Sequence, residues 1–255
     1  MNHIEYTVNQ SVATIQFNRP NKKNAITLDM YAEFANVLAK ANADAGVRAV
    51  LITGAGNAFT SGNDIIDFRE RMGREEGGPA EQFMLSIVNS EKPMIAAVNG
   101  VAVGAGVSML LHCDLVYASH DATFKLPFVS LGICCEFSSS LTLPAVMGIQ
   151  RATELLLLGE VIDAHKAMEY GFVNAVHAPD ALQEAAFAAA LRIAQQPLES
   201  VRATRAFLRE AMRPQYVERL SEERRTITRL LASPEARSAF DGFFARRGST
   251  PETII

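Results

Sequence analysis

The stretch that decides the fold is "KPMIAAVNGVAVGAGVSM", residues 92–109. It begins with a short uncharged run, Met94 to Val98, which is typical of a strand buried on both faces. The glycine-rich segment "GVAVGAG" follows and leads into "VSMLLH", a small apolar segment that predicts a helix. Strand, turn and helix in this order form the unit from which parallel α/β sheets are built. We therefore expect an α/β fold.

Two further segments predict buried strands on either side of this stretch. "RAVLIT", residues 48–53, is continuously apolar apart from its ends, and it runs into the small residues of "GAGNAFTSGNDI". "DLVYAS", residues 114–119, predicts a third strand. Because segments with helical spacing separate these strands, the sheet that they form should be mostly parallel.

The N-terminal part of the chain predicts a hairpin followed by a helix. "IEYTV" and "VATIQF" alternate apolar and polar residues around the turn "NQS". After the loop "NRPNKKN", Thr27 is a candidate N-cap, because its side-chain oxygen can accept a free N–H of the first helical turn. The residues that follow it are apolar at helical spacing, namely Leu28, Tyr31, Phe34, Leu38 and Ala41.

The second half of the chain changes in character after about Pro144, where amphipathic helical patterns replace the strands. We predict two parts: a core over residues 1–196 that holds the functional site, and a helical region over residues 197–255. Within residues 69–79, "REEGGP" mixes charge with glycine and predicts a mobile loop at the entrance to a site.

The composition is that of an ordinary soluble globular protein. The 255 residues are 49% hydrophobic and 20% charged, and the formal net charge is −4. A net acidic chain has no global attraction to nucleic acid or to an anionic membrane. No segment is apolar enough to span a membrane, and the N-terminus has no secretion signal, so the cytoplasm is the default location.

The cysteines and histidines predict neither a disulfide framework nor a metal site. Cys113, Cys134 and Cys135 lack paired spacing, and reduced packing residues are the favoured interpretation. The five histidines show no i, i+4 pairing and no acidic companion at zinc spacing. A metal enzyme is therefore not expected.

The glycine-rich segments do not fit a nucleotide-binding motif. Gly104 and Gly106 match G-x-G, but Met109 stands where the third glycine of a dinucleotide site belongs. The chain also contains neither the G-x-S-x-G of a serine hydrolase nor the phosphate loop that ends in G-K-[ST].

The turns after two of the buried strands could instead bind an anion. Turns of small residues before a helix leave backbone N–H groups without partners, and the helix N-terminus adds positive potential. Two such donors that point at one oxygen make an oxyanion hole, which stabilises an enolate or a tetrahedral anion. Close packing of a helix on a strand also requires small residues, and on the pattern alone it is the stronger explanation.

A single charge stands in the long uncharged stretch "LPFVSLGICCEFSSSLTLPAVMGI", residues 126–149, and that charge is Glu136. Burying a carboxylate is costly unless it is paired or used. Two interpretations are open: a core carboxylate with a fixed partner, or a catalytic group that exchanges a proton.

Several motifs together resemble the crotonase superfamily, the enoyl-CoA hydratases and isomerases. They are "RPNKKNAIT", "AVLITGAGNAFTSGNDIIDF", "KPMIAAVNGVAVGAG", "CDLVYASHDATFKLPFVSLG" and "ATELLLLGEVIDAHKAMEYGFVNAV". Within that group the chain is most similar to the peroxisomal-type Δ3,Δ2-enoyl-CoA isomerases. The resemblance implies a spiral of ββα units with a C-terminal α-helical trimerisation region, assembled as a homotrimer or hexamer. It also implies an acyl-CoA thioester as substrate, with coenzyme A as part of that substrate and no further cofactor or metal.

The resemblance also assigns roles to residues. The oxyanion donors would be the backbone N–H groups of Asn63 and Ala105. The two glutamates that hydratases use fall on Ser108 and Phe128, neither of which can act as an acid or base. The glutamate of the isomerases falls on Glu136. The contacts to adenine and pantetheine fall on the main chain of Ser61, Gly62, Asn63, Asp64 and Ile65.

The surroundings of Glu136 carry two further expectations. Apolar neighbours should raise its pKa toward neutrality, which suits a group that accepts and returns a proton. The isomerases typically have "SPEG" where this chain has "CCEF", so the resemblance does not fix the acyl-chain preference. For the phosphates of coenzyme A the resemblance points to Lys22 and Lys23, and to Phe243 and Arg246 near the C-terminus.

Three functions remain open at this point. The first is an isomerase that converts a 3-enoyl-CoA to a 2-enoyl-CoA. The second is another crotonase-type reaction, such as hydration, hydrolysis, decarboxylation or dehalogenation, because the same oxyanion hole serves all of them. Asp64, Asp67 or Asp163 would then supply the chemistry. The third is a CoA-binding protein without turnover, in which Glu136 is a core carboxylate.

Overall fold

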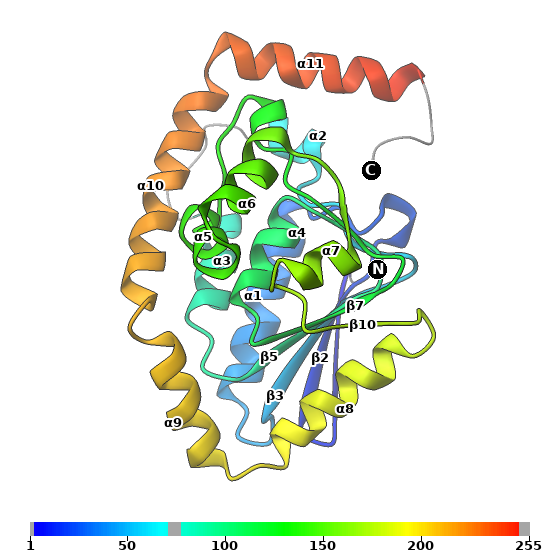
Figure 1. Ribbon diagram of the computed structural model, residues 1–255, viewed down its shortest axis with the longest axis vertical. Helices are drawn as coiled ribbons and strands as arrows, with labels where there is room; N and C mark the ends of the chain where they lie inside the picture. The colour runs from blue at the N-terminus through cyan, green and yellow to red at the C-terminus, as the bar shows by residue number, and fades with distance from the viewer. Residues whose placement is uncertain (1–2, 71–77, 250–255) are drawn as a thin grey trace.

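The computed structural model describes residues 3–70 and 78–249, and it is built around a six-stranded sheet (Figure 1). The strand order is β1 (Ile4–Asn9), β2 (Val12–Phe17), β3 (Ala49–Gly54), β5 (Met94–Val98), β7 (Leu115–Ser119) and β10 (Ala175–His177). Only β1 and β2 pair in the antiparallel sense, and the other neighbours are parallel. The predicted hairpin, the three buried strands and the mostly parallel sheet are confirmed. Of the range 69–79 in which the entrance loop was predicted, residues 71–77 lie outside the described residues, and the ends of that range belong to α2 (Ile65–Glu70) and α3 (Pro79–Val88).

A second sheet of four short strands corrects the prediction for the glycine-rich segments. Its order is β4 (Ala58–Thr60), β6 (Val101–Val103), β8 (Thr123–Lys125) and β9 (Ile162–Asp163). The segments after β3 and β5 were expected to be turns, but each contains a strand of this second sheet. Three residues are too few to show an alternating pattern, so these strands have no periodic signature in the sequence. Strands β3, β5 and β7 are thus each followed by a short strand in the other sheet, as a spiral of ββα units requires.

Helices fill the connections between strands and the C-terminal part of the chain. They are η1 (Pro20–Lys22), α1 (Leu28–Ala43), α2 (Ile65–Glu70), α3 (Pro79–Val88), α4 (Ala105–Ser108), η2 (Met109–His112), η3 (Val129–Leu131), α5 (Ser139–Met147), α6 (Ile149–Thr153), η4 (Glu154–Leu158), α7 (Ala164–Glu169), α8 (Leu182–Ala194), α9 (Leu198–Arg209), α10 (Arg213–Leu231) and α11 (Pro234–Ser249). The predicted N-cap is confirmed, because the N–H of Met30 donates to Thr27 Oγ1 at 3.2 Å.

Helices cover both faces of the large sheet, which explains why its central strands are apolar on both sides. Helices α1 and α3 belong to the main core on one face. On the other face, helix α8 presents a row of apolar residues at every fourth position, and this row packs against Ala49, Leu51 and Ala97 of the sheet. The row consists of Leu182, Ala186, Ala190 and Ala194. The small side chains bring this helix close to the strands.

The C-terminal helices run along the outside of the α/β part and then across one end of it (Figure 1). Helix α9 is fastened at the start of β7, where Asp114 accepts hydrogen bonds from Arg205 Nε at 2.9 Å and Arg209 Nε at 3.2 Å. Helix α10 contributes Leu220, Ile227 and Leu231 to the main core. The helical region is therefore in direct contact with the loops that carry the site.

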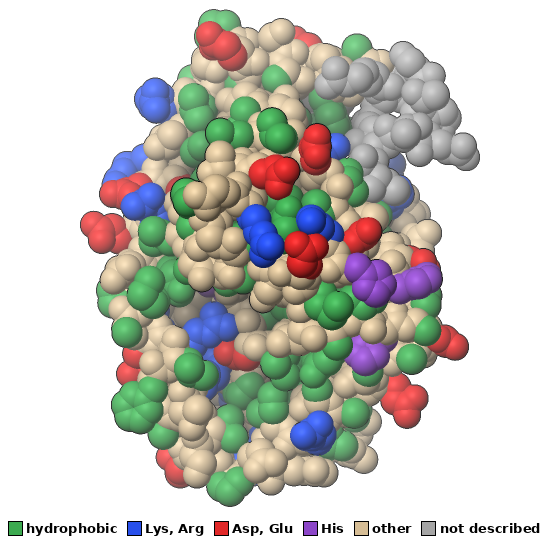
Figure 2. All heavy atoms as spheres, in the orientation of Figure 1, with side chains coloured by type: hydrophobic (Ala, Val, Ile, Leu, Met, Phe, Trp, Pro, Cys, Tyr) green, Lys and Arg blue, Asp and Glu red, His purple; other side chains and the backbone are tan. Residues whose placement is uncertain are grey.

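The surface shows mixed charge. On the face drawn in Figure 2, acidic and basic side chains are interspersed. A search of residues 3–70 and 78–249 finds no helix that is both long and apolar enough to cross a membrane.

Candidate active site

The two turns predicted to carry anion donors lie side by side because their strands are neighbours. Strand β4 pairs in parallel with β6, and Thr60 lies opposite Ala102. A Cβ added to Gly62 would stand 2.6 Å from Val103 O, and one added to Gly106 would stand 2.5 Å from Thr60 Cγ2. The small residues are thus needed for close packing, and the same packing sets the two turns next to each other.

Each turn presents one N–H group that the fold leaves unused. Ala105 is the first residue of α4, so its N–H has no acceptor within the helix. At the other turn, the N–H of Ile26 donates to Gly62 O, and Ile26 O accepts the N–H of Asp64. Asn63 lies between these two residues, and its N–H is not bonded to Ile26. Within the described part of the chain, neither the Asn63 N–H nor the Ala105 N–H donates a hydrogen bond. This arrangement is compatible with the predicted oxyanion hole.

The turn that carries Asn63 is held by residues for which the sequence analysis predicted no role. Asn24 is fully buried, and its Nδ2 donates to Ala55 O at 2.9 Å and Ala58 O at 2.8 Å. Tyr31 OH donates to Asn63 Oδ1 at 2.7 Å. Asn24 stands in the left-handed region with φ 55°, a conformation that asparagine tolerates better than most residues. Because Asn24 stands in a loop of polar residues, the local sequence does not predict that it is buried.

Asp64 has a structural role in this turn. Its carboxylate accepts a hydrogen bond from Arg19 at 2.6 Å and others from the N–H groups of Ile66 and Asp67 at the start of α2. Burial alone would raise the pKa of Asp64, but Arg19 and these N–H groups outweigh burial and lower it. The other two carboxylates considered for alternative chemistry are also engaged. Asp67 Oδ2 accepts the N–H of Leu28 at 2.7 Å, and Asp163 caps α7.

The predicted substrate-binding residues fall into two groups. Ser61 to Ile65 form the link from β4 to α2, and the N–H of Ser61 donates to Lys23 O at 2.9 Å, so Lys22 and Lys23 lie beside that link with exposed side chains. Phe243 is partly buried on α11, a helix that packs near η3, where a Cβ added to Gly132 would meet Ala236. The side chain of Arg246 lies outside the described residues. The two groups are thus carried by different elements.

Glu136 is a buried carboxyl group without a complete set of partners. It is 7% exposed, and Oε1 has no hydrogen-bond partner. Burial, followed by the charge of Glu223, raises its pKa from 4.5 to about 7. The charge of Glu136 in turn contributes to raising the pKa of Tyr31, the residue that bonds Asn63, although burial contributes more. Tyr31 therefore connects the carboxyl group with one of the two donor turns.

The backbone changes direction sharply after Glu136. Phe137 and Ser138 both lie in the left-handed region, with φ 62° and 58°. The Phe137 ring is buried and stacks on His112 at 4.7 Å between centroids, and His112 Nε2 donates to Phe137 O at 2.9 Å. Ser139 Oγ donates to Glu136 O at 2.6 Å. The bend thus separates Glu136 from the helix α5 that follows.

The two positions that correspond to hydratase glutamates carry no acid. Ser108 lies one turn after Ala105 on α4, and its fully buried Oγ has no partner. Phe128 is buried, and its ring lies 3.8 Å from where a Cβ on Gly104 would stand. Both side chains therefore border the turn of Ala105, and neither can transfer a proton as a carboxyl group does.

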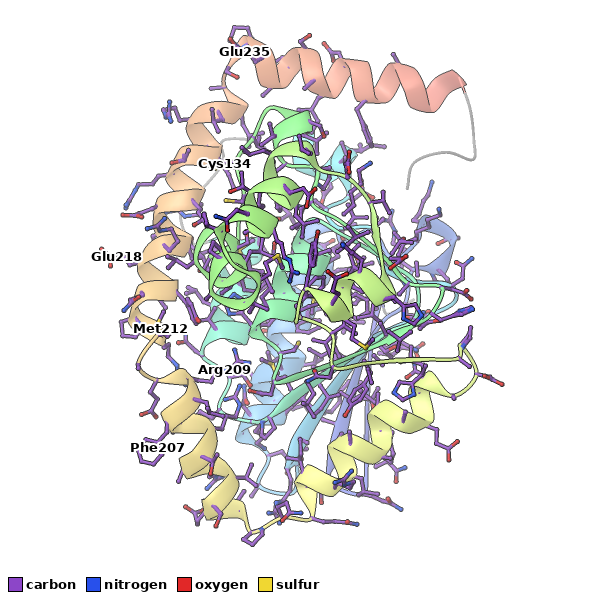
Figure 3. The ribbon with its side chains drawn as sticks, in the orientation of Figure 1. Cys134, Phe207, Arg209, Met212, Glu218 and Glu235 are labelled. Atoms are coloured by element: carbon purple, nitrogen blue, oxygen red, sulfur yellow. The ribbon has the colours of Figure 1, made fainter. Side chains whose placement is uncertain are left out.

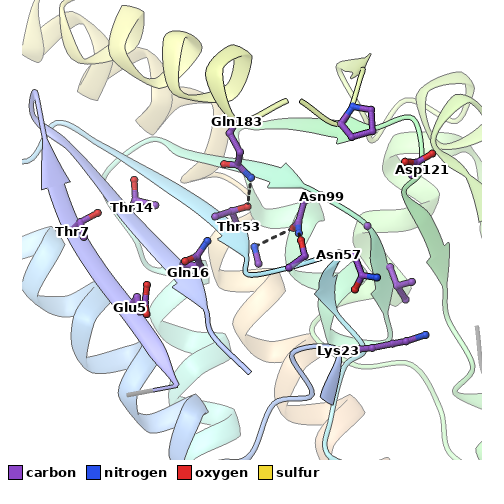
Figure 4. A pocket seen from close by; sticks show the side chains of 15 residues that line it. Glu5, Thr7, Thr14, Gln16, Lys23, Thr53, Asn57, Asn99, Asp121 and Gln183 are labelled. Carbon is purple, nitrogen blue, oxygen red and sulfur yellow. Dashed lines mark hydrogen bonds between the residues drawn. The ribbon is translucent and has the colours of Figure 1, made fainter. Parts of the chain in front are cut away.

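A cavity of about 810 Å³ opens at a different place, between the β1–β2 hairpin, the end of β3 and the start of α8 (Figure 4). Its polar side chains include Thr53, which accepts a hydrogen bond from Gln183 Nε2 at 2.7 Å, and Lys23 at its rim. Glu136, Asn63 and Ala105 do not line it. No group of three metal-ligating side chains occurs in the part of the chain that the structure describes.

The two interleaved sheets, the paired donor turns and the C-terminal helices define the crotonase fold. The family model for enoyl-CoA hydratase/isomerase matches residues 7–250, and the chain therefore belongs to that family. A solved structure of an enoyl-CoA hydratase/isomerase from Pseudoalteromonas atlantica T6c has the same fold, with a TM-score of 0.92 and 34% identity. It covers 96% of this chain, which covers 98% of that one. The predicted spiral of ββα units is confirmed.

Relatives within the family carry more than one activity in their names. The chain is 34% identical over 242 residues to enoyl-CoA delta isomerase 2 of Rattus norvegicus, a match that takes in 92% of this chain. It covers 62% of the rat protein and so spans about six-tenths of the length of that relative. A probable enoyl-CoA hydratase of Rhizobium meliloti (strain 1021) is 32% identical over 241 residues, with 92% of both chains covered.

Proposed function

We propose that the protein moves the double bond of an enoyl-CoA thioester from the 3,4 to the 2,3 position, with Glu136 as the proton carrier. The observation that supports this most is the state of Glu136, a buried carboxyl group with an unpartnered oxygen and a pKa of about 7. A buried carboxylate with only a structural role would have hydrogen-bond partners for both of its oxygens. A group that takes a proton and gives it back at neutral pH requires a pKa close to that pH.

The chemistry in this proposal divides between the backbone and one side chain. The thioester oxygen lies between the N–H groups of Asn63 and Ala105, which stabilise the negative charge that develops on it. Glu136 removes a proton from C2, and the electron pair of that C–H bond delocalises over the thioester and the C3–C4 double bond as a dienolate. The same carboxyl group then returns the proton to C4. Atoms are conserved, and the thioester is the electron sink.

Hydration is the competing reaction, since a named hydratase is among the relatives. A hydratase of the kind that the resemblance implies needs two carboxylates, one to hold water and one to deliver a proton. In this chain those positions hold Ser108 and Phe128. This difference favours isomerisation.

The proposal is tested with a 3-enoyl-CoA and with a 2-enoyl-CoA as separate substrates. Isomerisation produces the ultraviolet absorbance of a conjugated thioester from the first substrate and leaves the mass of the product unchanged. We expect Glu136→Gln to lower kcat by on the order of 10²- to 10⁴-fold, with acyl-CoA binding retained in calorimetry. Glu218→Gln, an exposed position, serves as the matched control.

Two outcomes would contradict the proposal. A product heavier by one water from the 2-enoyl-CoA would assign hydration instead. Tight binding of acyl-CoA with no turnover of either substrate, and with Glu136→Gln changing only thermal stability, would assign a CoA-binding protein.

A further inference from the structure

A second buried carboxylate, Glu223, reaches the Glu136 segment from α10. It lies 87 positions further along the chain and is 6% exposed. Its Oε2 accepts the N–H of Ser138 at 2.7 Å, and its Oε1 accepts the N–H of Ser140 at 3.1 Å and Ser140 Oγ at 2.5 Å. The Cys135 thiol is also close, with Sγ 3.8 Å from Oε1. Glu223 therefore contacts residues on both sides of Glu136.

The hydrogen bonds of Glu223 lie at a segment with an unfavourable backbone conformation, Phe137 and Ser138. Two consecutive non-glycine residues in the left-handed region cost free energy and persist only where neighbouring groups hold them. The N–H groups of Ser138 and Ser140 belong to the start of α5 and have no acceptor within that helix. Glu223 supplies the acceptor from outside. Helix α10 adds a second bond to the bend, because Ser138 Oγ donates to Tyr216 O at 2.7 Å.

The two carboxyl groups also differ in the number of hydrogen bonds that they accept. Glu223 receives three donor hydrogens from Ser138 and Ser140, whereas Oε1 of Glu136 receives none. Burial raises the pKa of Glu223 above its ordinary value, but these donors and the charge of Arg219 favour its ionised form and oppose that rise. When two carboxyl groups lie close together, the better-solvated one ionises first and the other retains its proton.

We propose that Glu223 is the positioning residue of the active site, because its carboxylate holds the left-handed bend after Glu136 and sets a negative charge against the catalytic carboxyl group. This inference rests on the proposed function of Glu136. It makes α10 a part of the catalytic apparatus, although Glu223 itself touches no substrate.

The tyrosine, histidine and cysteine side chains around Glu136 in the described part of the chain are neutral, and the charged groups there besides Glu223 are arginines of α10. Tyr31 of α1 has a pKa raised well above its ordinary value, mainly by burial. Burial lowers the pKa of His112, on η2, to about 4 and raises that of Cys135 to about 12, so both are uncharged near pH 7. Cys134 has a raised pKa for the same reason. The cations of α10 nearest the loop are Arg219, 3.4 Å from Ser140 Oγ, and Arg229, whose charge acts on Cys134.

The test separates the charge of Glu223 from its hydrogen bonds. Glu223→Gln keeps the shape and one acceptor oxygen but removes the charge, and Glu223→Ala removes both. Glu218→Gln is the control, since Glu218 lies on the same helix and points away from the body of the protein (Figure 3). The titration of Glu136 is followed directly by NMR with ¹³C-carboxyl glutamate, and its signal is assigned with Glu136→Gln. Rates are measured over the same pH range.

We expect Glu223→Gln to move the titration midpoint of Glu136 to lower pH, and the acid limb of kcat/KM to follow it. Glu223→Ala should lower kcat by about 10- to 100-fold, the cost of a catalytic group displaced by about 1 Å, with KM changed far less. An unmoved Glu136 midpoint in Glu223→Gln, or wild-type kcat in a folded Glu223→Ala, overturns the inference. The NMR titration gives its result even if the wild-type protein isomerises no 3-enoyl-CoA, so failure of the proposed reaction is recognised separately.

Discussion

At the scale of single residues, Glu136 carries a cost in stability that matches its proposed task. In the unfolded chain its carboxyl group has an ordinary pKa, but burial raises the value to about 7 in the folded protein. Between those two values the folded state holds a proton that the unfolded state has released. The contribution of Glu136 to stability is therefore full at low pH and is lost as the pH rises through 7.

This sign gives a prediction for Glu136→Gln, which cannot ionise. At pH 5 the variant and the wild type should have similar free energies of unfolding, and at pH 8 the variant should be the more stable. With a folded pKa of about 7 against 4.5, the pH-dependent part of the difference is on the order of 3 kcal/mol. Urea denaturation at both pH values measures it, with Glu218→Gln as the exposed control. A difference that stays constant with pH would contradict the raised pKa.

The residues of the site differ in how visible they are in the sequence. Glu136 is conspicuous because it is the one charge in residues 126–149. Tyr31 was predicted only as one of the apolar helix positions, and its hydroxyl bond to Asn63 depends on a contact between residues 32 apart. Glu223 is hidden among the many charges of α10, and only tertiary packing buries it. Local patterns therefore reveal the proposed proton carrier and conceal the groups that we propose to orient it.

At the scale of elements, the bend between η3 and α5 combines strain with a large buried side chain. Glycine would adopt the φ of 62° at Phe137 at little cost, and the resemblance places a glycine there. The Phe137 ring, however, is 1% exposed and packs between His112 and Phe83. Relief of the left-handed conformation is worth about 1–2 kcal/mol, whereas deleting a buried phenylalanine costs about 3–5 kcal/mol.

Phe137→Gly should therefore destabilise the protein, by roughly 1–4 kcal/mol from the difference of those terms, despite its better fit to the backbone. Unfolding by urea measures the change, and Phe137→Leu is the control that keeps the strain and most of the apolar volume. A more stable Phe137→Gly would mean that backbone strain outweighs packing at this bend.

The elements also show where sequence patterns stop being informative. The long strands β3, β5 and β7 and the capped helix α1 were predicted to within one or two residues, because each has a run or a period long enough to recognise. The short strands β4, β6, β8 and β9 were missed. They exist because the neighbouring strand completes their hydrogen bonds, so no local signal could reveal them.

At the scale of the whole molecule, charge limits how coenzyme A can be held. The protein has a formal net charge of −4, so the phosphates of the proposed ligand must meet a local cluster of basic groups. Lys22 and Lys23 are exposed and lie beside the Ser61–Ile65 link through the bond from Ser61 N–H to Lys23 O.

Lys23→Glu should weaken acyl-CoA binding, and more so at low ionic strength, because contacts between exposed charges are screened by salt. Turnover of bound substrate should be nearly unchanged, since the proposed proton transfer does not use the lysine. Calorimetry at two salt concentrations measures the effect, and Lys40→Glu on α1 serves as the control. Equal affinities of Lys23→Glu and the wild type at low salt would remove Lys23 from the site.

The two unused N–H groups have a consequence for how this scaffold can vary. Because main-chain N–H groups form the proposed anion-binding half of the site, a side-chain replacement at Asn63 or Ala105 leaves them in place unless it introduces proline or shifts the backbone. Differences in reaction then fall on the other half, where the proposed mechanism depends on which of positions 108, 128 and 136 carry a carboxyl group. A lineage can exchange one reaction for another through a few codons and keep its means of stabilising an anion throughout. In this chain position 136 alone of the three carries an acid.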